Sequence, residues 1–503
     1  METVIQVAQG QLRGSIENGL HIFKGVPYAA SIDGPNRFRA PQPRESWSGV
    51  RDATQIGLIS RQAPLPAPFG SPLPDAGADC LNLNVWSPDV NGSLPVFVWI
   101  HGGAFYGGSG VEAVYDGASF ARNGVVCVTI NYRLGAQGFL HLADHFLEFA
   151  ESGNAGILDQ IAALTWVQQN IAAFGGDPSR VTIGGESAGG MSVSSLMATS
   201  QAKGLFTQAI PQSGAGHNGI SAKTATVIAG EVLRRLDVKP GDSAALAKVT
   251  DEKLFEVQLE VMLLMGGPEA EIFGEVATSM MPFQPTYGTQ VLPQQPIDAI
   301  AAGSAAGIKV LTGATMQESL VFVVAMAEMF NEEMLEASVT QTFGSAEKGQ
   351  AALELYRAHR PSALPFQITA AVETDRMFIV PARRLADAQL KHSPDVWMYR
   401  FDWASLYDGA FGACHALELV FVFNNLHDPA ATYMCGDHAP QSVAEAMHQA
   451  WVAFVKTGNP QHSGIPSWPR HNTDVRPTMQ FNTTSTVGHN LNADEMALWD
   501  GVL

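Results

Sequence analysis

The 503-residue chain has little cysteine, few cations and no long apolar run, and each scarcity excludes a class of protein. Its four cysteines have no metal-type spacing, so we expect free thiols rather than a disulfide framework. Lys and Arg number 29 against 48 Asp and Glu, and a net charge of −19 repels nucleic acid and anionic membranes. No apolar run reaches the roughly 18 residues of a transmembrane helix. We therefore expect no metal, no nucleic-acid partner and no membrane anchor.

The N-terminus lacks the basic and apolar segments of an export signal. Together with the sparse cysteines, this predicts a cytoplasmic protein. A composition of 46% hydrophobic and 15% charged residues is typical of a globular chain, and the length suffices for a large core. The sequence leaves the oligomeric state open between monomer and homodimer.

Apolar runs alternate with helical periodicity along much of the chain, which predicts an α/β fold with a mostly parallel sheet. Residues 3–30 indicate a small antiparallel meander before it. Residues 222–300 and 318–392 have helical patterns and are interpreted as insertions that roof the active site. No linker divides the chain, so we expect a single domain over residues 1–503. The expected strands are 81–86, 95–100, 125–131, 181–185, 308–311 and 396–401, and the clearest helices are 157–174, 190–199 and 442–456.

A glycine-flanked serine provides the strongest chemical signal. Gly185, Ser187 and Gly189 match the G-x-S-x-G pattern of a nucleophile elbow, between an apolar run and a helical pattern. On such a strained strand-to-helix turn, side chains two residues before and after the serine would collide with the backbone. The helix that begins beside the serine favours a developing oxyanion.

A serine nucleophile needs a general base and an acid that orients it, and in this pattern they follow in the order acid, then histidine. Ten histidines lie downstream of Ser187. Among them, His415 follows the strand 396–401 across a glycine-containing loop. Glu318 follows the strand 308–311, where a sheet presents its loops at the carboxyl edge. The rival acids are Asp375, Asp402 and Asp408.

Two glycines after a buried strand predict an oxyanion hole. Gly102 and Gly103 follow His101, and consecutive glycines let two backbone N–H groups approach a substrate oxygen. The N–H of Ala188, directly after the serine, completes the set. Apolar side chains that could line the substrate pocket are Phe69, Phe105, Tyr106, Phe283, Met316 and Phe322. Met326, Met329 and Met334 could add an adaptable wall near the acid.

The chain resembles the type B carboxylesterases, the cholinesterase and p-nitrobenzyl esterase family of the α/β-hydrolase fold. The resemblance spans nearly the whole chain and rests on the motifs at 23–29, 37–41, 79–85, 101–103, 131–133 and 153–187. It implies Ser187 as nucleophile, Glu318 as acid and His415 as base. It also implies the oxyanion hole of Gly102, Gly103 and Ala188, a structural ion pair between Arg133 and Asp159, and no cofactor.

The chain departs from the family pattern at three places. Ala78 stands where a glutamate usually pairs with the arginine matching Arg37, so we expect that buried pair to be absent. Ser60 lies near the position of a cysteine that exported members bridge to the one matching Cys80. Residues 61–79 contain no tryptophan for a quaternary ammonium, which argues against acetylcholine as substrate.

These features predict hydrolysis of carboxylic esters, apolar or aromatic ones, through an acyl-enzyme. An alternative is hydrolysis of carbamates or aryl amides by the same triad. A further alternative is a non-catalytic scaffold of the same fold, against which the intact triad argues.

Overall fold

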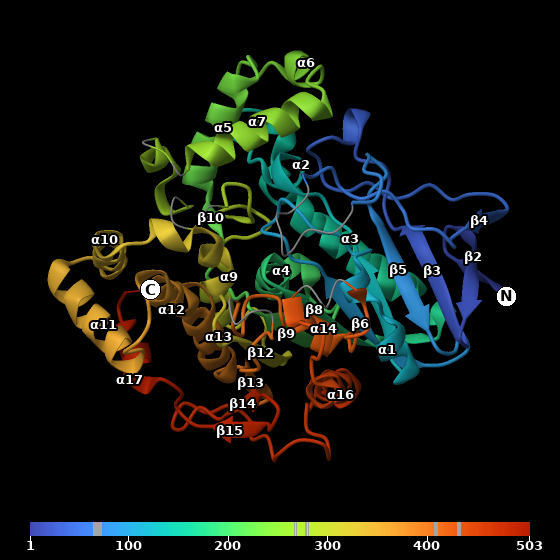
Figure 1. Ribbon diagram of the computed structural model, residues 1–503. Coiled ribbons are helices and arrows are strands. Elements are labelled where there is room, and N and C mark those ends of the chain that lie inside the picture. The colour runs from blue at the N-terminus through green and yellow to red at the C-terminus, as the bar shows by residue number, and fades with distance from the viewer. Residues whose placement is uncertain are drawn as a thin grey trace. The chain divides into compact units, whose positions relative to one another are not determined.

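The computed structural model describes residues 1–63, 73–265, 267, 269–276, 279, 281–406, 411–429 and 434–502. These residues form two compact units, each with its own strands and helices (Figure 1). The N-terminal unit comprises Met1–Ile210 and Gly216–Ala306, and the C-terminal unit comprises Pro211–Ala215 and Gly307–Leu503.

The N-terminal unit contains a mixed sheet with the strand order β1-β2-β3-β5-β7-β6-β8, and β4 pairs with β2. The successive pairs from β1 to β7 are antiparallel, whereas β6 runs parallel to both β7 and β8. β6 is apolar and almost wholly buried, as expected for a parallel strand covered on both faces. The strands are β1 (Glu2–Val7), β2 (Gly10–Glu17), β3 (Leu20–Pro27), β4 (Val50–Asp52), β5 (Asn82–Ser87), β6 (Leu94–Ile100), β7 (Val126–Ile130) and β8 (Gly176–Glu186).

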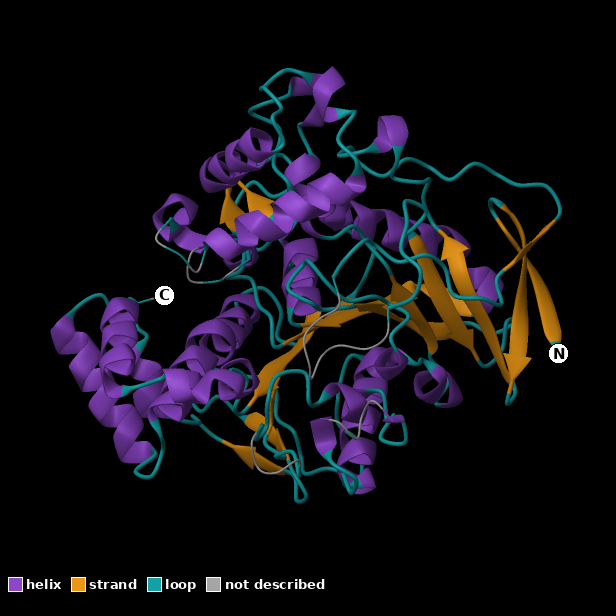
Figure 2. Cartoon of the chain, turned by 45° about the horizontal axis from the view of Figure 1, so that its top comes forward, coloured by secondary structure: helices purple, strands orange, loops and turns teal. Residues whose placement is uncertain are grey.

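Helices pack against this sheet, as Figure 2 shows. α4 (Ala188–Ala198) contacts β6 and β8, α3 (Ala155–Asn170) contacts β8, and α1 (Ala118–Arg122) contacts β5 and β7. The turn between β8 and α4 follows the last residue of β8. It therefore lies at the carboxyl end of the parallel strands β7, β6 and β8. The remaining elements are α2 (Gly135–Phe139), β10 (Ile220–Ser221), α5 (Ala222–Arg235), α6 (Ser243–Leu246), α7 (Asp251–Leu264), β11 (Thr286–Tyr287) and α8 (Pro296–Ala301).

The C-terminal unit contains the strand order β12-β13-β14-β15. β12, β13 and β14 are parallel, and β15 closes the series antiparallel to β14. β9 (Gln208–Gln212) carries the chain from the first unit into the second, and just beyond it the Ser213 N–H donates to the Gly313 carbonyl of β12. The strands are β12 (Lys309–Thr315), β13 (Val396–Phe401), β14 (Thr478–Phe481) and β15 (Thr486–Gly488).

Helices of the C-terminal unit fall into two groups. α13 (Val380–Leu390) packs against β12 and β13, and α16 (Gln441–Thr457) packs against β14 and α14 (Leu419–Val422). A second group surrounds its own apolar cluster, which includes Leu335, Phe343, Leu353, Tyr356 and Trp499. That group consists of α10 (Glu332–Phe343), α11 (Ala346–His359), α12 (Pro365–Thr374) and α17 (Ala493–Leu498), with α9 (Leu320–Val323) beside α12. A π-helical turn, η9 (Asp375–Ile379), joins α12 to α13.

The boundaries of α10 illustrate how local sequence sets these helices. The Asn331 side chain accepts a hydrogen bond from the Met334 N–H, and two glutamates follow in the first turn. Both features stabilise the unpaired amides and positive dipole of a helix N-terminus. Gly344 ends the helix with φ of 77°, a left-handed conformation that glycine adopts without steric cost.

The structure confirms most expected elements and adds detail to the sheet. The N-terminal meander is present and continues into the main sheet through the pairing of β3 with β5, so the whole sheet is mixed, with parallel pairs among β7, β6 and β8 and among β12, β13 and β14. β9, β14 and β15 were not predicted from the sequence. β9 carries Pro211 and a glutamine at each end, and β14 and β15 are short, so none of them stands out as an apolar run. The regions 222–300 and 318–392 are mainly helical as predicted, yet α13 belongs to the layer against β12 and β13.

The four cysteines are buried and free, as the sequence predicts. Over the described ranges, no helix combines the length and apolarity needed to cross a membrane.

Candidate active site

Ser187 stands at a sharp turn between β8 and α4. Its φ of 56° and ψ of −125° are values that non-glycine residues rarely adopt, and such strain is concentrated at functional sites. Ser187 is also the N-cap residue of α4, and its carbonyl accepts the Met191 N–H at 2.9 Å. The Ala188 N–H therefore belongs to the first turn of a buried helix, where amides have no partner within the helix.

The two glycines of the motif are required by close backbone approach. A Cβ added at Gly189 would lie 2.1 Å from the carbonyl oxygen of Ile100. A Cβ at Gly185 would lie 2.5 Å from the Gly189 carbonyl carbon and 2.6 Å from the same Ile100 oxygen. Both approaches are to backbone, which cannot rotate away. The steric reason predicted for the glycines is thus confirmed.

The segment after β6 runs beside this turn. A Cβ built on Gly102 would lie 2.8 Å from the Glu186 carbonyl oxygen and 3.2 Å from the Ser187 Cβ. Gly103, Ala104 and Phe105 all have positive φ, at 104°, 52° and 62°. Three such residues in succession reverse the chain tightly, and only a backbone without bulk at Gly102 can pass the nucleophile this closely.

Contacts of His101 hold the start of this loop. Its Nδ1–H donates to the Gly102 carbonyl at 2.8 Å, and its ring stacks on Tyr132 at a centroid distance of 4.4 Å. The Tyr132 hydroxyl in turn donates to the His101 carbonyl at 2.9 Å. Burial lowers the pKa of His101 to about 4, so the ring is neutral at neutral pH and supports the loop without adding charge.

Gln62 fixes the end of the same loop. Its Oε1 accepts the Gly108 N–H at 2.7 Å, and its Nε2 donates to the Gly108 carbonyl at 2.8 Å. Sequence reasoning missed this residue, because a glutamine within a Pro-rich loop carries no recognisable pattern. The signal available was only that Gly107 and Gly108 extend the glycine segment, which indicates a flexible backbone but does not point to Gln62.

Glu318 and His415 meet in the C-terminal unit. Glu318 Oε2 lies 2.5 Å from His415 Nδ1, and the Glu318 carbonyl accepts the His415 backbone N–H at 3.2 Å. The other carboxylate oxygen, Oε1, accepts the Ser213 hydroxyl at 2.5 Å and the Thr315 N–H at 2.6 Å. Glu318 is fully buried, and three donors replace the water that an exposed carboxylate would bind.

The loop that carries His415 is held by Gln317, the neighbour of the acid. The Gln317 side chain accepts the Ala413 N–H at 3.0 Å, while its backbone N–H donates to the Ala413 carbonyl at 2.9 Å. The His415 ring contacts the rings of Phe322 and Phe378 at centroid distances of 5.2 and 4.9 Å. Ser213 and Gln317 were missed by sequence reasoning, since each acts only through a partner distant in sequence.

Two other histidines of this unit also pair with carboxylates, and their positions distinguish them. His471 Nε2 contacts Asp387 at 2.7 Å, and its N–H donates to the Val396 carbonyl at the start of β13. His359, at the end of α11, pairs with Glu495 of α17 at 2.9 Å. Only the Glu318–His415 pair lies at the carboxyl ends of β12 and β13, where α/β sheets bind ligands.

The other candidates for the acid of the triad either have different partners or lie outside the described residues. The buried Asp375 accepts the Tyr356 hydroxyl at 2.5 Å, and Asp402 pairs with Arg400 at 2.6 Å. Asp408 lies outside the described residues. Glu318 is therefore the acid that the structure pairs with a histidine at this edge of the C-terminal sheet.

The structure divides the proposed site residues between the two units. Ser187, Ala188, Gly102 and Gly103 lie together in the N-terminal unit, and Glu318 and His415 lie together in the C-terminal unit.

The residues expected to line a pocket have varied surroundings. Phe105 is buried and packs on Phe139, and Phe283 is also buried. Tyr106 is half-buried. Met316 borders a cavity in the C-terminal unit, whereas Met326, Met329 and Met334 are exposed. Phe69 lies outside the described residues. Contact of these side chains with substrate stays a prediction.

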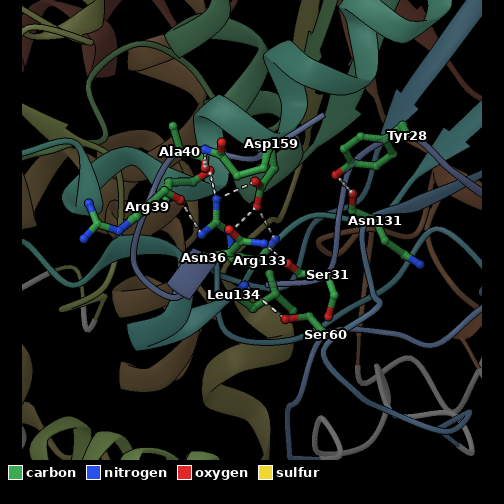
Figure 3. A network of polar contacts seen from close by, with 12 residues as sticks. Tyr28, Ser31, Asn36, Arg39, Ala40, Ser60, Asn131, Arg133, Leu134 and Asp159 are labelled. Carbon is green, nitrogen blue, oxygen red and sulfur yellow. Dashed lines mark hydrogen bonds and ion pairs between the residues drawn. The ribbon is translucent and has the colours of Figure 1, made fainter. Parts of the chain in front are cut away.

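The ion pair implied by the family resemblance is present (Figure 3). Arg133 and Asp159 are buried and joined by two hydrogen bonds between their side chains, at 2.6 and 2.7 Å. Asp159 also accepts the Arg133 backbone N–H, and the guanidinium donates to the Arg39 carbonyl. Ser60 accepts the Leu134 N–H at 3.2 Å, so a serine hydroxyl serves here as a hydrogen-bond acceptor.

Arg37, whose usual partner is replaced by Ala78, pairs with another acid. Its guanidinium lies 3.0 Å from Asp251 at the start of α7 and also donates to the Val249 carbonyl. As expected, Arg37 cannot form an ion pair with Ala78. Asp251 of α7 compensates its charge instead.

Comparison with known proteins identifies the family. Residues 1–499 match the family model described as the carboxylesterase family. The chain is 40% identical to the para-nitrobenzyl esterase of Bacillus subtilis (strain 168), over 96% of each chain. It is 36% identical to the phenmedipham hydrolase of Pseudarthrobacter oxydans, over 94% of this chain and 93% of that one. A solved carboxylesterase from Geobacillus stearothermophilus superposes with a TM-score of 0.85 at 37% identity, over 99% of this chain and 100% of that one. The chain therefore belongs to the carboxylesterase family, has the α/β-hydrolase fold and is a carboxylic ester hydrolase.

Proposed function

We propose that the ester is cleaved through an acyl-enzyme on Ser187, with His415 as general base and Glu318 as the acid that orients it. The observation that carries this proposal is the buried Glu318–His415 pair at the carboxyl ends of β12 and β13. The strained conformation of Ser187 supports the choice of nucleophile.

In the proposed first step, His415 Nε2 accepts the Ser187 hydroxyl proton while the serine oxygen bonds to the ester carbonyl carbon. The N–H groups of Gly102, Gly103 and Ala188 hold the oxyanion that forms. His415 then protonates the departing alcohol, and the acyl group remains on the serine. In the second step the same imidazole removes a proton from water as the water oxygen bonds to the acyl carbonyl carbon. The imidazolium then returns that proton to the Ser187 oxygen as the bond to the acyl group breaks, which releases the carboxylic acid and restores the serine hydroxyl.

Glu318 supports both steps without exchanging a proton. Its carboxylate accepts the His415 Nδ1–H, which leaves Nε2 free to act as base, and its charge stabilises the imidazolium. Three donors hold the buried carboxylate in place. The proposed substrates are apolar or aromatic esters of small molecules, acted on in the cytoplasm by a monomer or homodimer. The four buried free cysteines are consistent with a reducing compartment.

Replacing the nucleophile tests the proposal directly. Ser187→Ala should lower kcat for p-nitrophenyl butyrate by about 10⁴-fold or more, because the covalent step is lost. Ser194→Ala is the matched control: Ser194 lies in the same helix, α4, and its buried hydroxyl makes no hydrogen bond with any residue that the structure describes. A fluorophosphonate probe should label the native protein at Ser187, as located by peptide mass spectrometry. Near-normal turnover of Ser187→Ala would overturn the assignment.

Substrate preference requires a second experiment. Rates should be compared for p-nitrophenyl esters of increasing acyl length, and for an ester, a carbamate and an anilide with the same acyl and aryl groups. Faster turnover of longer or aromatic acyl esters is the expected result. A larger kcat/KM for the carbamate or anilide would replace ester preference by the alternative chemistry.

A further inference from the structure

A second cavity of about 260 Å³ lies in the C-terminal unit, next to α13 and the strands β12, β13 and β14. Figure 1 labels these four elements. Water occupies roughly 30 Å³ per molecule, so this space can hold a solute with on the order of ten non-hydrogen atoms. Its walls come from β12–β14, from η9 and α13, and from the chain around α17. They include the apolar side chains of Ile379, Ala382, Met398, Leu491 and Met496.

Three arginines also line this cavity, and their charges are unequally compensated. Arg400 is neutralised by Asp402 through two hydrogen bonds, at 2.6 and 2.9 Å. Arg476 shares Asp387 with His471 through a longer contact of 3.3 Å, and its buried Nε has no acceptor.

Arg383 is the third, and it makes no hydrogen bond or ion pair with any described residue. The pKa of Arg383 is lowered because the side chain is partly buried and because the positive charge of Arg476 repels it. The charge of Arg384 acts in the same direction, whereas Asp387 and Asp500 act in the opposite one. Two guanidinium groups thus line the cavity with donors that no carboxylate of the described residues satisfies.

An anion with an apolar body fits this combination. A carboxylate matches the paired N–H donors of a guanidinium, and the charge-assisted hydrogen bonds that result are about twice as strong as neutral ones. The aliphatic and thioether side chains opposite would cover a hydrocarbon or phenyl group. A phosphate ion, in contrast, would turn hydrated oxygens toward these apolar walls, where they would lose hydrogen bonds.

We propose that this cavity binds a monocarboxylate with a short aliphatic or aromatic tail, held by Arg383 and Arg476. Carboxylates of this kind are products of ester hydrolysis, so the site would sense the accumulated product. The choice of ligand rests on the esterase function, whereas the binding measurement does not depend on turnover.

Methyl NMR offers a local readout, because Met398 and Met496 line the cavity. Octanoate, with ten non-hydrogen atoms, is the probe, and 1-octanol and inorganic phosphate test the need for the charge and for the tail. Octanoate should shift both methionine methyl signals with a Kd on the order of 1 mM or tighter. Arg383→Gln should weaken this binding at least about tenfold, because one charge-assisted interaction with the carboxylate is lost.

Arg470→Gln is the matched control, because Arg470 pairs with Asp395 at an exposed position and does not line the cavity. It should leave the octanoate titration unchanged, and both variants should retain p-nitrophenyl ester hydrolysis and the thermal midpoint. Equal octanoate binding by Arg383→Gln and native protein would overturn the proposal. So would the absence of methyl shifts at about ten times the expected Kd, or equal shifts with octanol or phosphate.

Discussion

Individual residues around Glu318 support its proposed role. Glu318 is fully buried, and a buried polar group is costly unless hydrogen-bond donors replace its hydration. Ser213 and Thr315 supply those donors on the oxygen that does not face His415. Ser213 is thus a positioning residue, since it acts on the base only through Glu318.

Ser213→Ala tests that role. Removing the hydroxyl deletes a hydrogen bond to a charged group worth about 1.5–3 kcal/mol, so kcat should fall by roughly 10- to 100-fold. KM should change little, because Ser213 touches no substrate atom in the proposed mechanism. Ser195→Ala removes a buried hydroxyl that bonds only within α4, and it should retain kcat. Equal kcat values for both variants would exclude the positioning role.

The Arg133–Asp159 pair gives a prediction about stability. Asp159→Asn leaves the Arg133 charge buried without compensation, which should lower the free energy of unfolding by about 3–5 kcal/mol. Glu256→Gln breaks the exposed Lys253 pair and should cost less than about 1 kcal/mol. Urea denaturation of the two variants measures both values. Similar losses in the two would show that burial does not set the strength of these pairs.

At the scale of an element, the turn from β8 into α4 depends on its close passage past β6. Gly189→Ala would place a Cβ 2.1 Å from a backbone oxygen, so either α4 or β6 must move. We expect a loss of at least about 3 kcal/mol in stability or failure to fold, and loss of esterase activity in any folded fraction.

A second glycine gives the control. Gly230 lies inside α5, where an added Cβ would meet no atom closer than 3.7 Å. Gly230→Ala should therefore raise stability by roughly 0.5–1 kcal/mol, since alanine loses less backbone entropy in a helix. Thermal midpoints that move in the same direction for both glycine variants would contradict the steric argument.

At the scale of the whole molecule, two buried acids tie stability to pH. Burial raises the pKa of Glu112 in the N-terminal unit, and that of Asp375 in the C-terminal unit, to about 7 each. The unfolded chain loses these protons near pH 4, so between about pH 4 and 7 it binds fewer protons than the folded chain. The two groups therefore favour folding at low pH, and this contribution is lost as pH rises toward 7.

Replacing the acids should remove that trend. When the pH is raised from 5 to 7.5, the free energy of unfolding should fall less in Asp375→Asn and in Glu112→Gln than in the native protein. For each variant, the slopes against pH should differ from the native slope by up to about 1.4 kcal/mol per pH unit. Denaturation at the two pH values provides the measurement. A native pH dependence unchanged in both variants would show that the buried acids do not titrate in this range.

The sequence predicted much of this architecture where the pattern was local. The apolar runs located β6, β7, β8 and β13, and the glycine spacing located the elbow before its strained φ was known. Strands such as β14 gave no signal, because four residues in a polar stretch become a strand only by pairing with β13. Gln62, Ser213 and Gln317 were missed for the same reason: a polar side chain acquires its role from a partner that the fold supplies. Whether the 503 residues act as one domain stays a prediction.

The four buried thiols make selective labelling of this protein straightforward. Burial raises the pKa of Cys80 and of Cys435 to about 12, and raises the pKa of Cys127 and of Cys414 still further. Because the thiolate is the nucleophile, the native cysteines react very slowly with maleimides at neutral pH. Leu147 is 93% exposed. A cysteine introduced there would react with a dye or spin label while the native cysteines stay unlabelled, so none of them needs to be replaced.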